Sequence, residues 1–358
     1  MPVNLQLPLK RISFPAATIL FLLGHFAFAQ SPNALIPGPK PRDAPEQWKP
    51  WIGDYGEKEG RFIVAESDGH LLIIDNHGKQ WDLSSLPIEE SVVAERTSTT
   101  LVKVHFSTNP IGERVLDTND LSWSKNTYGV DDQHVARMKP VRPIDELRPL
   151  ALAAKPPEES GSLRKPELVE LAPLDSSVRL DIRYATTNDF LGTPVYSQAR
   201  AFLQRPAADA LLRVQKKLKP LDYGLLIHDA YRPWYVTKIF WDATPPEGKI
   251  FVAHPAQGSR HNRGCAVDLT LYDLDTGKPI EMPGTYDEMS PRSFPDYPGG
   301  TSLQRWHRDL LRRAMESEGF TVNESEWWHF DYKDWKEYPI LNVPFEKLDT
   351  NSGTVPVH

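Results

Sequence analysis

The distribution of proline constrains the fold of this chain more than any other feature of its sequence. The 358 residues include 33 prolines, about twice the usual share, and many of them fall in two segments, 30–50 and 139–164. Neither segment suits a helix or a central strand. We therefore expect an extended leader at 30–50 and a semi-rigid linker at 139–164. Folded regions are expected at 51–138 and 165–345, with a tail at 346–358.

The first 29 residues have the pattern of an export signal. Lys10 and Arg11 precede a largely apolar run that ends in Ala27-Phe28-Ala29, a small-x-small sequence typical of signal peptidase sites. A membrane anchor is the alternative, but the run contains a proline, a glycine and a histidine and is barely long enough to span a bilayer. We therefore expect cleavage near Ala29. The mature protein is expected in the periplasm or secreted, without a membrane span.

Composition limits the function classes open to the chain. It is 40% hydrophobic and 25% charged, so it can bury an ordinary soluble core. Its net charge is −7 and no basic stripe stands out, which argues against a nucleic-acid partner. The single cysteine, Cys265, can form no intramolecular disulfide. The sequence identifies no protein partner.

Residues 51–138 show a succession of short β patterns. Apolar runs at 61–65 and 71–74 flank Asp68-Gly69, a hairpin turn signal. We expect a small antiparallel barrel or sandwich. The outline resembles the lipocalin-like modules appended to some bacterial serine hydrolases. Four histidines of this region lack metal-ligand spacing and are expected at the surface: His70, His77, His105 and His134.

Residues 165–345 alternate helix and strand patterns, which predicts an α+β domain with an antiparallel sheet and flanking helices. Helices are expected at 206–218, 234–243 and 302–317, and strands at 225–227, 265–272 and 326–332. His307 follows the apolar Trp306 on one of these helices and is expected to face solvent. The linker should make few contacts, so that the β domain would be dispensable for chemistry.

The first candidate site pair is His261 and Asp268. A glycine turn separates the two residues, and Asp268 interrupts an otherwise apolar strand. An ionised carboxylate between Val267 and Leu269 is costly unless it is paired, and a metal ion is one suitable partner. The alternatives are a loop histidine and a hydrogen-bonded strand residue.

The second candidate stretch is the aromatic strand 326–332. His329 is either a metal ligand or a core histidine packed among aromatic rings. In a regular strand Glu326 points away from the face of His329, so it can approach a shared site only from a bend or bulge that starts the strand. Two histidines and one aspartate leave one position of a tetrahedral Zn²⁺ open, and Glu326 has the chemistry of a general base.

A third candidate is Arg232, which follows a buried strand and can supply positive charge to a developing oxyanion. The alternative is a structural salt bridge to Asp229 or Asp242.

Together these motifs resemble the VanX-type D-alanyl-D-alanine dipeptidases, zinc peptidases of family M15. The family's S-x-H-x-x-G-x-x-x-D signature falls on Ser259, His261, Gly264 and Asp268. Its E-x-W-H signature falls on Glu326, Trp328 and His329, and its Y-R-P arginine is Arg232. The stretch 181–190 is also similar. The likeness covers residues 165–345.

This resemblance implies a D,D-peptidase or hedgehog-like fold with one Zn²⁺ per chain. It implies that His261, Asp268 and His329 bind the zinc. Glu326 would take a proton from the attacking water, and Arg232 would stabilise the tetrahedral intermediate.

The resemblance also suggests substrate contacts. Residues 282–287 are similar to the family's M-G-x-x-F-D loop, with Pro283 inserted and Tyr286 in place of phenylalanine. In that loop Asp287 could hold the free ammonium of the substrate. The anionic C-terminus is expected near Ser259.

The activity that this resemblance implies is hydrolysis of the D-Ala-D-Ala dipeptide to two D-alanines. The alternative is a D,D-carboxypeptidase that acts on peptidoglycan stem peptides, because such relatives share the zinc site. The long segment between Asp268 and Glu326 favours a closed pocket and therefore the dipeptide. A non-catalytic binding module is disfavoured because all three ligands, the base and the arginine are present.

Overall fold

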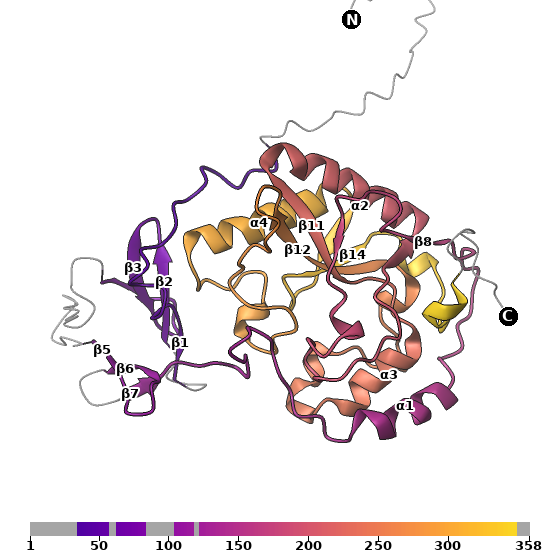
Figure 1. Cartoon of the computed structure of the whole chain (residues 1–358), viewed down its shortest axis with the longest axis horizontal. Coiled ribbons are helices and arrows are strands. Elements are labelled where there is room, and N and C mark those ends of the chain that lie inside the picture. The colour runs from indigo at the N-terminus through magenta and orange to yellow at the C-terminus, as the bar shows by residue number, and fades with distance from the viewer. Residues whose placement is uncertain (1–33, 57–61, 84–103, 118–121, 349–358) are drawn as a thin grey trace, which may run out of the picture.

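The computed structural model describes residues 34–56, 62–83, 104–117 and 122–348 (Figure 1). The predicted export signal at 1–29 lies outside these ranges, as do residues 349–358 of the predicted tail. Among the described residues, no helix combines the length and the apolar character needed to cross a bilayer.

The N-terminal β region forms two antiparallel sheets at one side of the larger domain (Figure 1). One sheet has the order β1-β2-β3-β4: β1 (Gly53–Tyr55), β2 (Phe62–Ser67), β3 (His70–Ile74) and β4 (Gln80–Asp82). The other has the order β5-β6-β7: β5 (His105–Thr108), β6 (Arg114–Asp117) and β7 (Ser122–Ser124). A shared apolar cluster includes Tyr55 and Val64 of the first sheet and Phe106 of the second.

The predicted hairpin at Asp68-Gly69 is confirmed. Both residues have positive φ, 51° and 83°, as a two-residue hairpin turn requires, and Ser67 pairs with His70 across the turn. The four histidines of the β region are exposed, as predicted. Closure of the two sheets into a barrel or sandwich, and the likeness to lipocalin-like modules, stay predictions.

The larger domain is built on a five-stranded sheet of order β13-β14-β12-β11-β9. Its strands are β9 (Arg179–Leu180), β11 (Tyr223–Asp229), β12 (Ala266–Asp273), β13 (Phe320–Val322) and β14 (His329–Tyr332). Neighbouring strands are antiparallel except β9, which runs parallel to β11 at the edge. A separate antiparallel pair joins β8 (Leu168–Glu170) and β10 (Phe202–Gln204). The prediction of a mainly antiparallel α+β sheet therefore agrees with the structure, with β9 as the exception.

The three predicted helices form close to the expected positions. They are α2 (Arg205–Leu218), α3 (Trp234–Ala243) and α4 (Ser302–Glu316). Proline stands in the first turn of α2, where its missing N–H costs no hydrogen bond. Thr301 and Gln304 form a capping box that begins α4. Helices α2 and α4 contact each other, with α2 against β11 and α4 against β12 and β13.

The expectation that the linker holds no helix is wrong. Residues 144–153 form α1 (Ile144–Ala153), which packs against α3 even though Pro149 lies within it. The proline removes one backbone hydrogen bond. Burial of Ile144, Leu147 and Ala151 at helical spacing outweighs that loss, because tertiary packing supplies most of the stability of a short helix.

The leader also packs on the larger domain, which overturns the expectation that His307 is exposed. Leu35 joins the main core, and Trp306 Nε1 donates a hydrogen bond to the Gly38 carbonyl. Lys40 Nζ donates to the hydroxyl of Tyr223, which bonds in turn to His307 Nε2 at 2.9 Å. His307 is consequently only 6% exposed.

The two domains are in direct contact, contrary to the expectation of few contacts between them. Ala65 of β2 forms a β bridge with Gly300, and Tyr297 is buried in a cluster with Ile63, Ala65 and Ile74. These contacts join the β domain to residues 285–302, the segment that leads from the active site into α4.

Candidate active site

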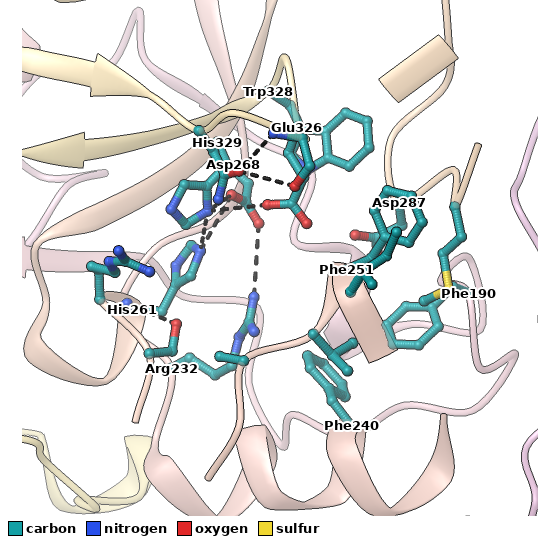
Figure 2. Close-up of a pocket in the computed structure, with 18 of the residues that line it drawn as sticks. Phe190, Arg232, Phe240, Phe251, His261, Asp268, Asp287, Glu326, Trp328 and His329 are labelled. Carbon is teal, nitrogen blue, oxygen red and sulfur yellow. Dashed lines mark hydrogen bonds and ion pairs between the residues drawn. The ribbon is translucent and has the colours of Figure 1, made fainter. Parts of the chain in front are cut away.

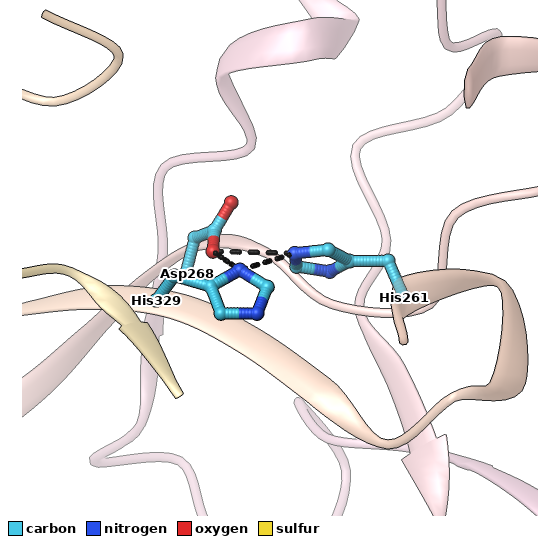
Figure 3. Close-up of side chains that lie close together, drawn as sticks. All are labelled: His261, Asp268 and His329. Carbon is cyan, nitrogen blue, oxygen red and sulfur yellow. Dashed lines mark hydrogen bonds and ion pairs between the residues drawn. The ribbon is translucent and has the colours of Figure 1, made fainter. Parts of the chain in front are cut away.

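The three predicted metal ligands come together from three elements (Figure 3). His261 begins a short 3₁₀ turn, Asp268 lies on β12, and His329 lies opposite Asp268 on β14. All three side chains are buried. Nε2 of His261 is 3.0 Å from Nδ1 of His329, and Oδ1 of Asp268 lies 3.3 Å and 3.0 Å from these two nitrogens.

In each histidine one ring nitrogen faces the cluster and the other, outer nitrogen faces away from it. The hydrogen-bond partner of the outer nitrogen determines whether the inner nitrogen carries a proton or a lone pair. His261 Nδ1 lies 2.7 Å from the Ala230 carbonyl, and His329 Nε2 lies 2.9 Å from a carboxylate oxygen of Asp331. Both partners only accept hydrogen bonds, so in a neutral ring the outer nitrogen is the one that carries the proton. In that state the inner nitrogens present lone pairs to each other and to Asp268 Oδ1, which has no hydrogen-bond donor among the described residues. A bound cation would resolve this convergence, and the donor set suits Zn²⁺.

Asp331 was not predicted to act in the site, yet it orients His329. The sequence did place the two residues on one strand face, two positions apart. Burial lowers the pKa of His329, but Asp331 and Asp268 outweigh this effect and raise that pKa well above its usual range. The electrostatic field at the centre therefore favours positive charge.

Glu326 lies in the turn before β14 and not in the strand itself. This agrees with the expectation from strand period, and it brings Glu326 Oε2 to 3.7 Å from His329 Nδ1. Burial raises the pKa of Glu326 to about 7, with His329 opposing and Asp268 reinforcing the shift. A carboxyl group with a pKa near neutrality can both accept and release a proton.

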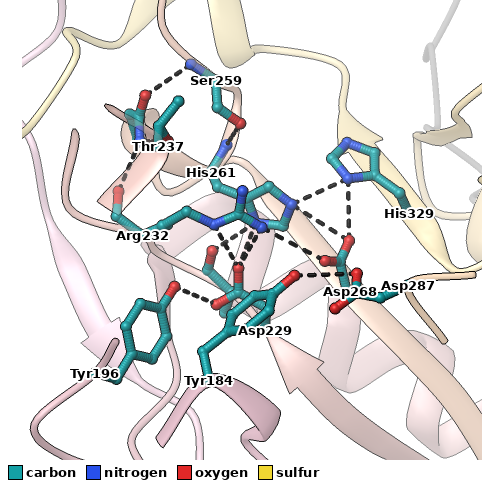
Figure 4. A network of polar contacts seen from close by, with 12 residues as sticks. Tyr184, Tyr196, Asp229, Arg232, Thr237, Ser259, His261, Asp268, Asp287 and His329 are labelled. Atoms are coloured by element: carbon teal, nitrogen blue, oxygen red, sulfur yellow. Dashed lines mark hydrogen bonds and ion pairs between the residues drawn. The ribbon is translucent and has the colours of Figure 1, made fainter. Parts of the chain in front are cut away.

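Arg232 lies beside the predicted metal ligands and is held by Asp229 (Figure 4). Its Nε and Nη2 donate to Asp229 Oδ2 at 2.9 Å and 2.7 Å, while the Tyr196 hydroxyl donates to Oδ1 at 2.7 Å. The salt-bridge alternative with Asp229 is thus present, whereas Asp242 pairs with a lysine. Nη2 of Arg232 also lies 3.7 Å from Asp268 Oδ2. The ion pair with Asp229 therefore keeps the positively charged guanidinium group beside the predicted metal ligands.

Asp287 lies across the same pocket from the predicted metal ligands (Figure 2). Its φ of 59° is in the left-handed region, which aspartate tolerates better than most residues. Oδ1 accepts a hydrogen bond from the Tyr184 hydroxyl at 3.1 Å, but the buried Oδ2 has no donor in the part of the chain that the structure describes. Burial, reinforced by Asp268, raises the pKa of Asp287 well above its usual range. A cationic group on a ligand would oppose this rise, favour the ionised carboxylate and pair with Oδ2.

Ser259 also lines the pocket. Its hydroxyl accepts from the His261 N–H at 3.2 Å, and its own N–H donates to Asn262 Oδ1 at 2.7 Å. These bonds brace the turn that carries His261. Direct binding of substrate by Ser259 stays a prediction.

Tyr286 is a second contributor that the sequence did not reveal. Its hydroxyl lies 3.0 Å from Asp268 Oδ2 and 3.0 Å from the Tyr184 hydroxyl, which bonds to Asp287. A chain of hydrogen bonds therefore connects Asp268, a predicted metal ligand, to Asp287. Tyr286, where the resemblance predicts phenylalanine, was the available signal, because the added hydroxyl is what completes the chain.

The pocket itself is small, about 160 Å³, against the 300–1,000 Å³ or so of pockets that hold drug-sized ligands. Aromatic side chains from several elements line it, namely Phe190, Phe240, Phe251 and Trp328 (Figure 2). Asp287, Glu288 and Met289 form one wall.

Comparison with known proteins agrees with this geometry. The chain is 35% identical over 179 residues to the D-alanyl-D-alanine dipeptidase of Escherichia coli, which is 50% of this chain and 91% of that protein. It is 36% identical over 180 residues to the D-alanyl-D-alanine dipeptidase of Enterococcus faecalis, 45% of this chain and 89% of the relative. Residues 164–347, which begin after the β domain, match the M15 peptidase family, described as D-Ala-D-Ala dipeptidase. This chain belongs to that family of peptidases.

Proposed function

We propose that this chain is a zinc-dependent dipeptidase that hydrolyses D-Ala-D-Ala to two D-alanines. One observation carries the proposal: a single small pocket holds three converging candidate metal ligands and, across from them, the buried Asp287 Oδ2, which has no donor among the described residues. The similarity to D-alanyl-D-alanine dipeptidases supports the choice of substrate.

The residues of the pocket divide the chemistry among them. A zinc ion held by His261, Asp268 and His329 would supply a Lewis acid that polarises the scissile carbonyl and activates water. Glu326 accepts the proton of the attacking water and passes it to the departing amine. Arg232 offers positive charge to the oxygen on which negative charge develops. Asp287 binds the free ammonium and so sets the position of the scissile bond.

A D,D-carboxypeptidase acting on stem peptides is the second candidate. Such a substrate carries an amide where the dipeptide carries its ammonium. The amide would leave the buried Asp287 Oδ2 without a cationic partner, and the chain beyond it would have to fit a small, aromatic-walled pocket. Both features favour the dipeptide.

The test is release of D-alanine from D-Ala-D-Ala by the purified chain, with zinc content measured in parallel. We expect about one zinc per chain. Glu326→Gln should retain the metal and lose about 10²–10⁴-fold in turnover, the usual contribution of a general base. Glu324→Gln, an exposed glutamate outside the pocket, is the matched control and should behave as wild type. A zinc-loaded wild type that releases no D-alanine would refute the proposal.

We also propose that the chain is exported and works outside the cytoplasm. The support is the sequence pattern of residues 1–29. N-terminal sequencing of the protein recovered from the periplasm or medium should begin at Gln30. A cytoplasmic protein that keeps residues 1–29 would contradict this expectation.

A further inference from the structure

We propose that the N-terminal β domain acts as a positioning element for the active site. It holds the bridging segment, residues 285–302, and through it fixes Asp287, so that it contributes to the preference for a free dipeptide. The inference rests on the proposed function. The β domain lies outside the part of the chain that matches the family, so the family gives it no role.

The bridging segment adds to the edge of the first β sheet. Strand β1 pairs with β2 only as far as Val64, so the end of β2 continues past its neighbour. At this open edge Ala65 forms a parallel bridge with Gly300, and the N–H of Glu66 donates to the Gly300 carbonyl at 3.1 Å. Gly300 has a φ of 77°, which favours glycine at this contact. The end of the segment is thus held by backbone pairing.

Glu66 is the central side chain of this interface. It is 2% exposed, and its two carboxylate oxygens accept hydrogen bonds from backbone N–H groups of different domains. Oε1 accepts from Gly69 N in the β2–β3 turn, and Oε2 accepts from Ser302 N at the start of α4, both at 2.7 Å. The N-terminus of a helix carries partial positive charge, which favours a carboxylate there. One side chain therefore joins the hairpin to the helix that follows the bridging segment.

Tyr297 provides a second anchor within the segment. Its hydroxyl donates to Asp54 Oδ2 at 2.8 Å, and its ring packs in the buried cluster with Ile63, Ala65 and Ile74. This anchor combines apolar burial with a buried hydrogen bond to a strand of the β domain.

The other end of the bridging segment reaches the pocket and is also held by the β domain. Thr285 Oγ1 donates to the His134 carbonyl at 2.7 Å, two residues before Asp287. Arg292 donates to the Thr127 carbonyl at 3.4 Å and forms an ion pair with Glu288, which is buried in the pocket wall. Contacts to the β domain therefore flank Asp287 on both sides in the sequence.

The segment depends on these contacts because it has little regular structure of its own. Between Thr285 and Thr301 the structure shows only one short 3₁₀ turn, Pro291–Ser293. The metal ligands, in contrast, lie on β12, on β14 and on the turn that precedes β12. Loss of the anchors should therefore displace Asp287 and spare the zinc. A displacement of about 1 Å at a binding group can cost about 10²-fold in rate.

The experiment compares Glu66→Gln and Tyr297→Phe with Glu113→Gln in the full-length, zinc-loaded protein. Glu113 is an exposed glutamate of the β5–β6 turn that bonds to Asn109, far in sequence from the interface residues. We expect both interface variants to raise KM for D-Ala-D-Ala by about tenfold or more with a smaller change in kcat. Their preference for D-Ala-D-Ala over N-acetyl-D-Ala-D-Ala should fall about as much. Zinc content should be unchanged, and the amides of 285–301 should exchange hydrogen faster than in the control.

Two results would overturn the inference. One is wild-type KM, preference and amide exchange in Tyr297→Phe, which keeps the aromatic ring and is the milder variant if Glu66→Gln folds poorly. The other is loss of zinc in step with loss of kcat, which would indicate general destabilisation. Failure of the proposed function would show differently, since wild type itself would then cleave neither compound or cleave both at equal rates. The exchange rates of 285–301 would still report whether the β domain holds the segment.

Discussion

Replacing Asp287 with asparagine is expected to remove most of the preference for a free dipeptide and to leave the metal centre intact. Asparagine tolerates the φ of 59° as aspartate does, and its carbonyl can still accept from the Tyr184 hydroxyl. The change therefore removes a charge with little change in shape.

The expected loss in kcat/KM can be worked out from the surroundings of Asp287 Oδ2. Oδ2 is shielded from solvent and has no donor within the described residues, so the substrate's ammonium would be its partner. Removing one member of a buried charge pair costs roughly 2–5 kcal/mol, which corresponds to tens to thousands of fold in kcat/KM at about 1.4 kcal/mol per tenfold. Wild type should prefer D-Ala-D-Ala over its N-acetyl derivative by such a factor. In Asp287→Asn, kcat/KM should fall by most of that factor for the free dipeptide and should change little for the N-acetyl derivative.

The assay measures D-alanine release from both compounds at matched zinc content. Asp296→Asn is the control, because Asp296 belongs to the same segment and its side chain is 93% exposed. Equal wild-type rates on the two compounds would favour the carboxypeptidase alternative. If Asp287→Asn slowed both compounds equally, Asp287 would not be the ammonium site.

Three further outcomes follow from the structure. His329→Ala should abolish stable zinc binding, as metal analysis after dialysis would show, because it removes one of three ligands. Arg232→Ala should lower kcat more than it raises KM, by about 10²–10³-fold, since the oxyanion exists only in the transition state. Burial, and secondarily Lys40, lowers the pKa of His307 to about 4. An unfolded histidine titrates near 6.5, so the unfolded state binds more protons between these values, and stability should fall by about 3 kcal/mol as the pH drops through that window. Denaturation of His307→Gln should show a flatter pH dependence.

The cluster of His261, Asp268 and His329 was predictable because local sequence patterns indicate it. His261 and Asp268 flank a glycine turn, and a charge inside an apolar strand demands a partner. The strand period placed His329 on a face that Glu326 could approach only from outside the strand, and the turn before β14 does bring it there.

Other elements were not predictable because long-range packing determines them. A proline at position 149 argues against a helix, and only the burial of Ile144, Leu147 and Ala151 against the larger domain reverses that argument. The amphipathic pattern of its helix predicts that His307 faces solvent, but in the structure the leader packs over this part of the helix. In both cases the deciding partner lies far away in the sequence.

The contacts between the two domains were also not predictable from the sequence, because they join residues that lie far apart in the chain. Glu66 lies in a strand where alternation would allow any polar side chain to face water, so its sequence context does not reveal burial. In the structure its carboxylate is almost fully buried and is satisfied by N–H groups of both domains. Leaving such a group buried without its partner costs about 1–3 kcal/mol or more. The β domain therefore has a surface that is suited to contact with the larger domain. Apart from the larger domain it would expose Ile63 and Ile74 and release Asp54 from Tyr297.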